Sequence, residues 1–208
     1  FFQAEDGIRD FCLSRGLGDV YKRQLIWYQL KWRATFYIIF GLKNQAMDIF
    51  EELYRLYPDD DYAIASLAFM KTEMGDKAGA IADYNRLVQS PNVTAAHWYN
   101  LGFLQEEMGQ VESAEFSFRQ SIKLNEKFDQ AYYGLGLALI QLQRFDEAIK
   151  ALKKNTQLQP MSPYAWYQLA RLYVEREQPD EASKIISHLK NFEPKFAKQL
   201  ERETGLAG

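Results

Sequence analysis

The stretch "DQAYYGLGLALIQLQRFDEAIKALKKNTQLQP", residues 129–160, indicates how most of the chain is organised. It superposes without a gap on residues 95–126 and on residues 163–194, each time with an offset of 34 residues. The same offset leads back to residues 61–92 and then to residues 27–58. A fixed period of roughly 20 to 50 residues is typical of architectures in which each unit packs on its neighbours. The sequence therefore predicts five units, beginning at residues 27, 61, 95, 129 and 163.

Two places in every unit hold only alanine or glycine, as is needed where two helices cross too closely for a large side chain. Agreement at all ten positions has a chance probability on the order of 10⁻⁸ when matches are counted. The agreement therefore supports the 34-residue register and indicates two places in each unit where backbones approach closely. The eighth places are Ala34, Ala68, Gly102, Gly136 and Ala170, and the twentieth places are Ala46, Ala80, Ala114, Ala148 and Ala182.

The third unit carries Trp98, Leu101, Gly102, Ala114 and Phe118 at fixed spacing. This pattern resembles the tetratricopeptide repeat (TPR) family, whose units read W-x₂-L-G-x₂-Y, then A-x₃-F, then P. The resemblance implies an all-α fold, a right-handed α-solenoid of five helix-turn-helix units plus a C-terminal capping helix. The repeats are expected at residues 27–60, 61–94, 95–128, 129–162 and 163–196, and the cap at residues 195–204, within one TPR domain over residues 25–208.

Residues 1–24 follow neither a helical nor a strand period. "SRGLGDVYKRQ", residues 14–24, resembles the in-frame translation of a transposon-library sequencing adapter, and "QAEDGIRD", residues 3–10, resembles that of the matching flow-cell primer. We therefore expect residues 1–24 to be a non-native, disordered tail and exclude them from fold reasoning. The native chain then begins at or before Leu25, with its true start missing, as in a fragment assembled from metagenomic reads.

The composition narrows the classes of function. The net charge of −3 gives no reason to expect a nucleic-acid partner. One cysteine, Cys12, and two distant histidines, His97 and His188, argue against a disulfide framework and a zinc site. No apolar run reaches the roughly 18 residues that a membrane span needs.

No set of side chains predicts catalysis. The acidic run at residues 59–61 is interpreted as a solvated loop with helix-capping aspartates rather than a cation site. "GLG", residues 134–136, follows no strand, so it is interpreted as packing glycine inside a helix. We therefore expect a protein without enzymatic activity, cofactor or metal.

The resemblance places function on the concave wall, which the first helix of each unit lines through places two, five, six, nine and twelve. These places are rich in aromatic residues and poor in charge, a composition that favours recognition of a peptide or helix. The alternative is that some of them, such as Tyr99 and Asn100, only reflect the scaffold consensus. The predicted groove residues are Tyr62, Phe69, Tyr99, Asn100, Phe103, Tyr133, Leu137, Tyr164, Tyr167, Gln168 and Arg171.

Three hypotheses of function follow. The first is a non-enzymatic scaffold that binds a protein segment in the groove, in an adaptor or assembly role. The second is the C-terminal TPR module of a larger enzyme or membrane-anchored protein whose upstream part is missing. The third is self-association through the first repeat, where "TFYIIF", residues 35–40, is apolar on every side unless it fills that repeat's own core. We expect a cytoplasmic location, with a periplasmic or membrane-anchored one left open.

Overall fold

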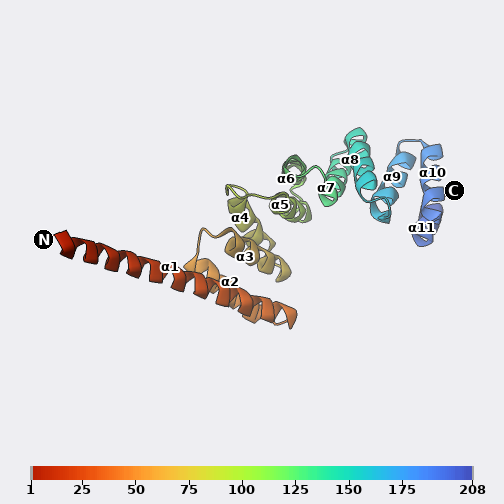
Figure 1. Ribbon diagram of the computed structural model, residues 1–208. Helices are drawn as coiled ribbons and strands as arrows, with labels where there is room; N and C mark the ends of the chain where they lie inside the picture. The colour runs from red at the N-terminus through yellow and green to blue at the C-terminus, as the bar shows by residue number, and fades with distance from the viewer. Residues whose placement is uncertain (1, 208) are drawn as a thin grey trace. The chain divides into compact units, whose positions relative to one another are not determined.

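The computed structural model describes the backbone of residues 2–207 and the side chains of residues 20–207. Over this range the chain forms eleven α-helices and no strand, which confirms the all-α prediction (Figure 1). The helices are α1 Phe2–Ile39, α2 Lys43–Leu56, α3 Asp61–Glu73, α4 Lys77–Leu87, α5 Ala95–Glu107, α6 Val111–Leu124, α7 Asp129–Gln141, α8 Phe145–Leu158, α9 Pro163–Glu175, α10 Pro179–Lys190 and α11 Pro194–Thr204.

The helices begin where the local sequence favours a start. Helices α3, α5, α7 and α9 begin at residues 61, 95, 129 and 163, which are the first residues of four predicted units. The side chain of Asp60 caps α3 by accepting a hydrogen bond from the Ala63 amide at 2.8 Å. Prolines open α9, α10 and α11, a position where their missing amide hydrogen costs nothing. The acidic run at residues 59–61 thus supplies the expected helix cap.

The ten small residues lie in the interior of the fold. All eight alanines of the set are fully buried, and Gly102 and Gly136 are buried as well. A Cβ built on Gly136 of α7 would lie 2.6 Å from Cδ2 of Leu152 on α8, closer than two carbons can approach. The two helices therefore meet at the predicted crossing point because these positions carry almost no side chain.

The turn between the two helices of a repeat places one residue in the left-handed region. These residues are Gly41, Gly75, Gly109, Gln143 and Glu177, spaced 34 positions apart, with φ between 55° and 88°. Only glycine adopts this conformation without a steric penalty. The backbone is therefore strained at Gln143 in the fourth repeat and at Glu177 in the fifth, but not at the glycines of the first three repeats.

We expect the Glu177→Gly variant to be more stable than the parent chain by about 0.5–1 kcal/mol. The left-handed backbone costs a non-glycine residue about 1–2 kcal/mol, and the greater freedom of glycine in the unfolded chain cancels part of the gain. Urea unfolding followed by circular dichroism measures the difference. Gly109→Ala is the matched control and should lose a similar amount, whereas an unchanged Glu177→Gly midpoint would contradict the strain argument.

Two compact units divide the chain, unit 1 over residues 1–83 and unit 2 over residues 84–208. The boundary falls inside α4, and one TPR domain over residues 25–208 stays a prediction. The physical reason for the division is that repeat stacks are held by nearest-neighbour contacts, and no single core joins distant repeats. The core of unit 1 is built around Phe50, Leu53 and Met70, and that of unit 2 around Phe118, Leu152 and Ile186.

Helix α1 differs from the prediction for residues 1–24. Its backbone is helical from Phe2 onward, where a disordered tail was expected. An α-helix satisfies its own backbone hydrogen bonds, so it can continue beyond its last tertiary partner. One contact lies near the end of this segment, where the Tyr57 hydroxyl donates to the carbonyl oxygen of Arg23. The adapter origin of residues 1–24 remains a hypothesis.

Candidate functional site

The eleven predicted groove residues lie on the first helices of their repeats. Tyr62 and Phe69 belong to α3 in unit 1, and the other nine belong to α5, α7 and α9 in unit 2. All eleven are exposed or half-buried, and none is part of the buried core. The first-helix wall, as we name it, is the set Tyr99, Asn100, Phe103, Tyr133, Leu137, Tyr164, Tyr167, Gln168 and Arg171 in unit 2.

At the α5 end of the first-helix wall, aromatic rings form a continuous cluster. The ring of Tyr99 stacks on Phe103 with 6.4 Å between centroids and contacts Phe128 at 5.4 Å. Beneath it lies the buried ring of Phe118, 5.9 Å away. Phe103 keeps 41% of its surface exposed, so the top of the cluster is open to a ligand.

Asn100 has a partner within the scaffold. Its Nδ2 donates to the hydroxyl of Tyr84 at 3.1 Å, and Tyr84 is buried. The bond holds the start of α5 against the last turn of α4. The interpretation of Asn100 as a scaffold residue is therefore supported by a contact, although its side chain remains half-exposed.

In the middle of the wall, α7 and α9 place two tyrosines close together. The rings of Tyr133 and Tyr164 lie 6.5 Å apart in a T-shaped arrangement, a favourable geometry for aromatic pairs. The Tyr133 hydroxyl also hydrogen-bonds the side chain of Gln168. Tyr164 is 59% exposed, so its ring offers contact area at a small cost in side-chain entropy.

The capping helix α11 covers the C-terminal end of the wall. The ring of Phe196 packs edge-on against Tyr164 at 5.7 Å and against Tyr167 at 5.8 Å. The Tyr167 hydroxyl lies 2.6 Å from Oε2 of Glu203 and accepts a hydrogen bond from Nε2 of Gln199 at 2.9 Å. Helix α11 thus supplies wall contacts through its own side chains.

The sequence reading missed Phe196, Gln199 and Glu203 as wall residues. Phe196 lies on the expected capping helix together with Leu200, which is buried. Gln199 and Glu203 would occupy places three and seven of a sixth unit, which are not wall places, so the 34-residue period does not point to them.

Two hollows lie on different sides of the second unit's last repeats. One, of about 300 Å³, is on the wall and is lined by Gln168 and Arg171 together with Ile140, Leu172, Val174 and Glu175. The other, of about 390 Å³, lies between α8, α9 and α10 and includes Trp166 and His188, whose rings are 4.7 Å apart. The first hollow contains two predicted groove residues, whereas the second contains none of them.

Burial changes the acid–base properties of the wall. It raises the pKa of the Tyr99 and Tyr133 hydroxyls above their usual range. It also raises the pKa of the Glu106 carboxyl, as does the neighbouring Glu107 carboxylate. A hydrogen bond from Nε2 of Gln141, 2.9 Å long, opposes the increase. At neutral pH the wall therefore carries uncharged tyrosines, and beside it the carboxyl group of Glu106 ionises less readily than usual.

We expect Glu106→Gln to raise the thermal midpoint at pH 7. A carboxyl whose pKa is raised by folding destabilises the folded state once it ionises, and it costs nothing below the unfolded pKa of about 4.3. The gain should be no more than about 2 °C, because the side chain is half-exposed and solvent screens the cost. Thermal unfolding at pH 7 and near pH 4 checks the sign. A lower midpoint at pH 7 would mean that the carboxylate stabilises the fold.

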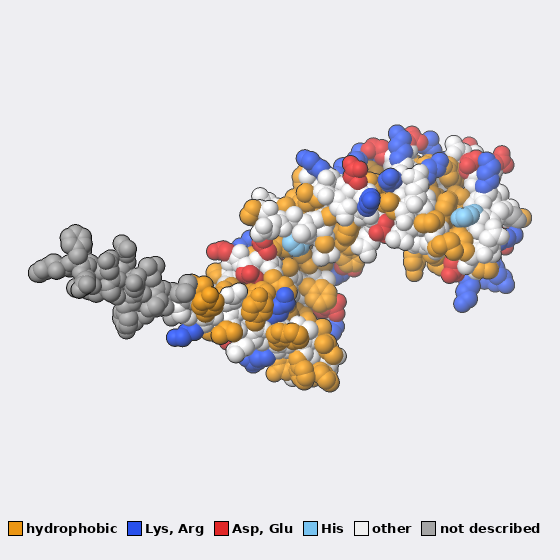
Figure 2. Space-filling model, viewed as in Figure 1, with side chains coloured by type: hydrophobic (Ala, Val, Ile, Leu, Met, Phe, Trp, Pro, Cys, Tyr) orange, Lys and Arg blue, Asp and Glu red, His pale blue; other side chains and the backbone are white. Residues whose placement is uncertain are grey.

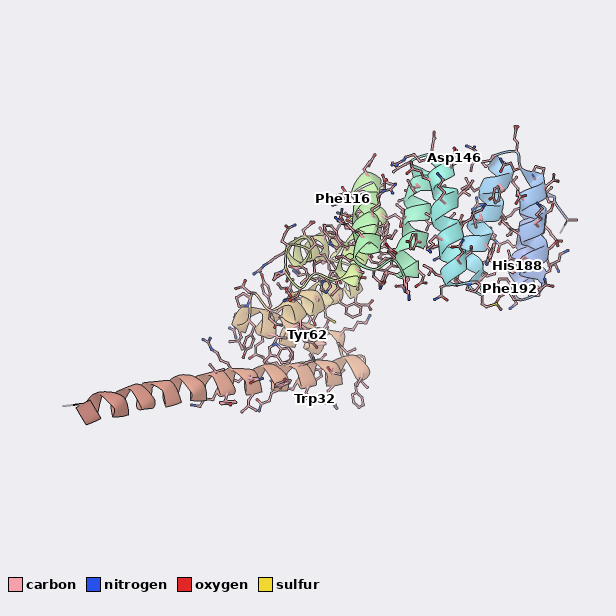
Figure 3. The ribbon with its side chains drawn as sticks, turned by 45° about the horizontal axis from the view of Figure 1, so that its top comes forward. Trp32, Tyr62, Phe116, Asp146, His188 and Phe192 are labelled. Carbon is pink, nitrogen blue, oxygen red and sulfur yellow. The ribbon has the colours of Figure 1, made fainter. Side chains whose placement is uncertain are left out.

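In unit 1, α1 partly covers the predicted residue Tyr62. The ring of Tyr62 lies 5.4 Å from that of Trp27, and Nζ of Lys31 sits 4.4 Å above it (Figure 3). Phe69 on the same helix is 48% exposed and free of these contacts. Tyr62 thus belongs to the packing of unit 1, and Phe69 is the more accessible of the two.

Across the described side chains, no three His, Cys, Asp or Glu residues gather as a metal site would require. Within the same part of the chain, every helix is too short or too polar to cross a bilayer.

Comparison with known proteins identifies the repeat. A family profile described as tetratricopeptide repeat matches residues 99–155, and a second, described as TPR repeat, matches residues 136–176. No curated protein matches the chain by sequence. The fold and the first-helix wall thus define a helical repeat protein, and residues 99–176 carry tetratricopeptide repeats.

Solved structures of similar fold include three TPR-type proteins. The crystal structure of the MamA protein has a TM-score of 0.74 at 20% identity, covering 88% of this chain and 97% of MamA. A tetratricopeptide repeat protein from Parabacteroides merdae has a TM-score of 0.75 at 20% identity, covering 86% and 74%. YrrB, described as a TPR protein with an unusual peptide-binding site, has a TM-score of 0.71 at 16% identity, covering 81% and 88%. At these identities the likeness shows the fold.

Proposed function

We propose that this protein is a non-enzymatic scaffold that binds a segment of another protein along the first-helix wall of unit 2. The observation that carries the proposal is the row of accessible aromatic side chains, Phe103, Tyr133 and Tyr164, contributed by three successive first helices. Aromatic side chains give large contact area at low entropy cost and are enriched where proteins bind one another. The peptide-binding site named for YrrB, a protein of similar fold, supports the same class of function.

The chemistry of the wall suggests the kind of segment it accepts. Apolar rings dominate from α5 to α9, and the hollow of about 300 Å³ adds polar groups from Gln168, Arg171 and Glu175. Arg171 is exposed, with its Nε 4.0 Å from Oε2 of Glu203, so its guanidinium can still engage a ligand. We therefore propose a segment with apolar anchors and one acceptor group, such as a backbone carbonyl or a carboxylate, directed at Arg171.

The alternative proposal is that the repeats are an accessory module of a larger enzyme or membrane-anchored protein. The exposed apolar side chains of α1 favour it, because such a surface is normally covered by another element. The partner-binding role of the wall is the same in both cases. A cytoplasmic location belongs to the first proposal and is tested by fractionating cells that express the protein.

Selection from a random peptide display library on the purified chain tests the wall. The triple variant Tyr133→Ala, Tyr167→Ala and Arg171→Ala should raise the dissociation constant for the selected peptides by at least about tenfold. Hot-spot aromatic and arginine side chains carry most of the binding energy. The matched control is Leu124→Ala with Met161→Ala, which removes exposed apolar side chains outside the wall. Circular dichroism confirms that both variants are folded. If binding survives the triple variant unchanged, the wall assignment is wrong.

A further inference from the structure

Helix α1 carries an apolar stripe that its own unit leaves uncovered. The stripe consists of Leu25, Tyr28, Trp32, Phe36 and Ile39, whose side chains are 60%, 48%, 75%, 54% and 74% exposed. Their spacing of three and four residues places them on one line along the helix. Figure 3 shows Trp32 on the side of α1 away from Tyr62, and Figure 2 shows hydrophobic side chains gathered over this part of unit 1.

The opposite face of α1 already packs inside unit 1. Leu30 and Ala34 are buried there in one core cluster with Ile49, Phe50 and Leu53 of α2. The stripe is therefore apolar surface in addition to the face of α1 that packs in the core. The interpretation of residues 35–40 as filling the first repeat's core is wrong for most of them, because Phe36, Ile38, Ile39 and Phe40 stay exposed.

The equivalent face of the next repeat shows how such a surface is normally used. On α3, Leu67 and Met70 occupy places seven and ten and are buried in the same cluster as α2. On α1 the same two places hold Arg33 and Phe36, and both are exposed. The stripe is thus continuous with the surface through which repeats in this fold stack on a preceding helix.

We propose that two copies of this chain pair through α1 in antiparallel fashion, with the two-fold axis passing near Trp32. The spacing of the stripe is symmetric about Trp32, three, four, four and three residues. Antiparallel pairing therefore sets Leu25 of one copy against Ile39 of the other, and Tyr28 against Phe36. A two-fold interface requires this self-complementarity, in which residue i meets residue j and residue j meets residue i.

The area available is close to what a stable dimer needs. Aromatic side chains bury about 150–250 Å² each, so the exposed parts of the five stripe residues amount to about 600 Å² per copy. Standard protein interfaces bury about 800 Å² per partner, and the flanking Phe40 adds to the total. The stripe alone thus supplies most of an interface of ordinary size.

The charge of α1 gives a second copy of this chain a different response to salt from that of an acidic helix or an anionic membrane. From residue 20 to residue 47 the sequence has cations but no acidic residue. Lys31 is held over the rings of Trp27 and Tyr62, at 4.9 and 4.4 Å, so Arg33 is the cation beside the centre of the stripe. Two copies bring their Arg33 side chains together, so added salt should strengthen the dimer by screening the repulsion. Salt would weaken binding of an acidic helix or an anionic membrane instead.

Sedimentation equilibrium of the full chain tests the proposal, at about 50 mM and about 500 mM NaCl, a range over which screening lengths fall severalfold. We expect a species of twice the 24.3 kDa chain mass, with a lower dissociation constant at the higher salt. Trp32→Glu and Ile39→Glu should each raise that constant by at least about tenfold, because they bury a charge in the interface. Met161→Glu, on a 67% exposed residue of unit 2, is the control and should leave the dissociation constant unchanged.

Three results of the sedimentation experiment would overturn the proposal. The first is a monomer at both salt concentrations up to about 100 μM protein, far above the dissociation constants usual for stable interfaces. The second is a dimer that survives both Trp32→Glu and Ile39→Glu. The third is a dimer weakened by salt. Cosedimentation with anionic phosphatidylserine vesicles, lost in Trp32→Glu, would assign the stripe to a membrane surface. None of these outcomes depends on peptide binding by the first-helix wall.

Discussion

Phe118→Ala is expected to lower the free energy of unfolding by about 3–5 kcal/mol, the usual cost of removing a buried phenylalanine ring. The ring is fully buried and lies between two helices of successive repeats. A Cβ built on Gly102 of α5 would lie 2.9 Å from its Cε1, and one on Gly134 of α7 would lie 2.6 Å from its Cζ. Both glycines leave space that only this ring fills, so its loss opens a cavity that neither backbone can close.

The control for this variant comes from the repeat itself. Leu152 occupies the same place in the next repeat, so Phe118→Leu should cost less than about 2 kcal/mol. Denaturant unfolding followed by far-ultraviolet circular dichroism measures both, at several denaturant concentrations because repeat arrays need not unfold in one step. Equal costs for the two variants would contradict the role assigned to the ring. Tyr99 rests on Phe118, so peptide binding should weaken in Phe118→Ala as well.

Ala148→Leu is expected to destabilise unit 2 by about 1–3 kcal/mol through overpacking. Ala148 is fully buried on α8 at the twentieth place of its repeat. Helices α7 and α8 approach so closely that a Cβ on Gly136 would already meet Leu152. A leucine side chain at residue 148 must therefore push the two helices apart or adopt an unfavourable rotamer.

Lys150→Leu places the same leucine side chain on the exposed face of α8. Its thermal midpoint should stay close to that of the parent chain, whereas that of Ala148→Leu should fall by several degrees. A midpoint of Ala148→Leu equal to that of Lys150→Leu would show that the repeat register is wrong.

The sequence was sufficient to predict the helix pairs because each position recurs in five units, where its residue type can be compared. Gly102, Gly136 and Ala148 could be placed at helix crossings without coordinates, since a close approach of two backbones tolerates only the smallest side chains. The structure adds that Gln143 and Glu177 adopt the left-handed turn conformation that glycine adopts in the first three repeats.

The candidate site was predictable as a set of positions but not as a set of contacts. The period located Tyr133 and Tyr164 on first helices, whereas the bond from Asn100 to Tyr84 depends on how α5 meets α4. The contact of α11 with Tyr167 was also missed, because the capping helix has no complete repeat pattern of its own. Contacts between elements depend on distances that no single repeat encodes.

The sequence by itself determined the repeat, the first residues of four of its five units and the row of aromatic side chains on the first helices, because each follows from local spacing and side-chain size. Tertiary structure alone decided which of these side chains remain accessible, that the chain divides within α4, and that the stripe around Trp32 stays exposed. Local spacing sets where a side chain points on its helix, but whether it is buried depends on the neighbouring element that packs against it.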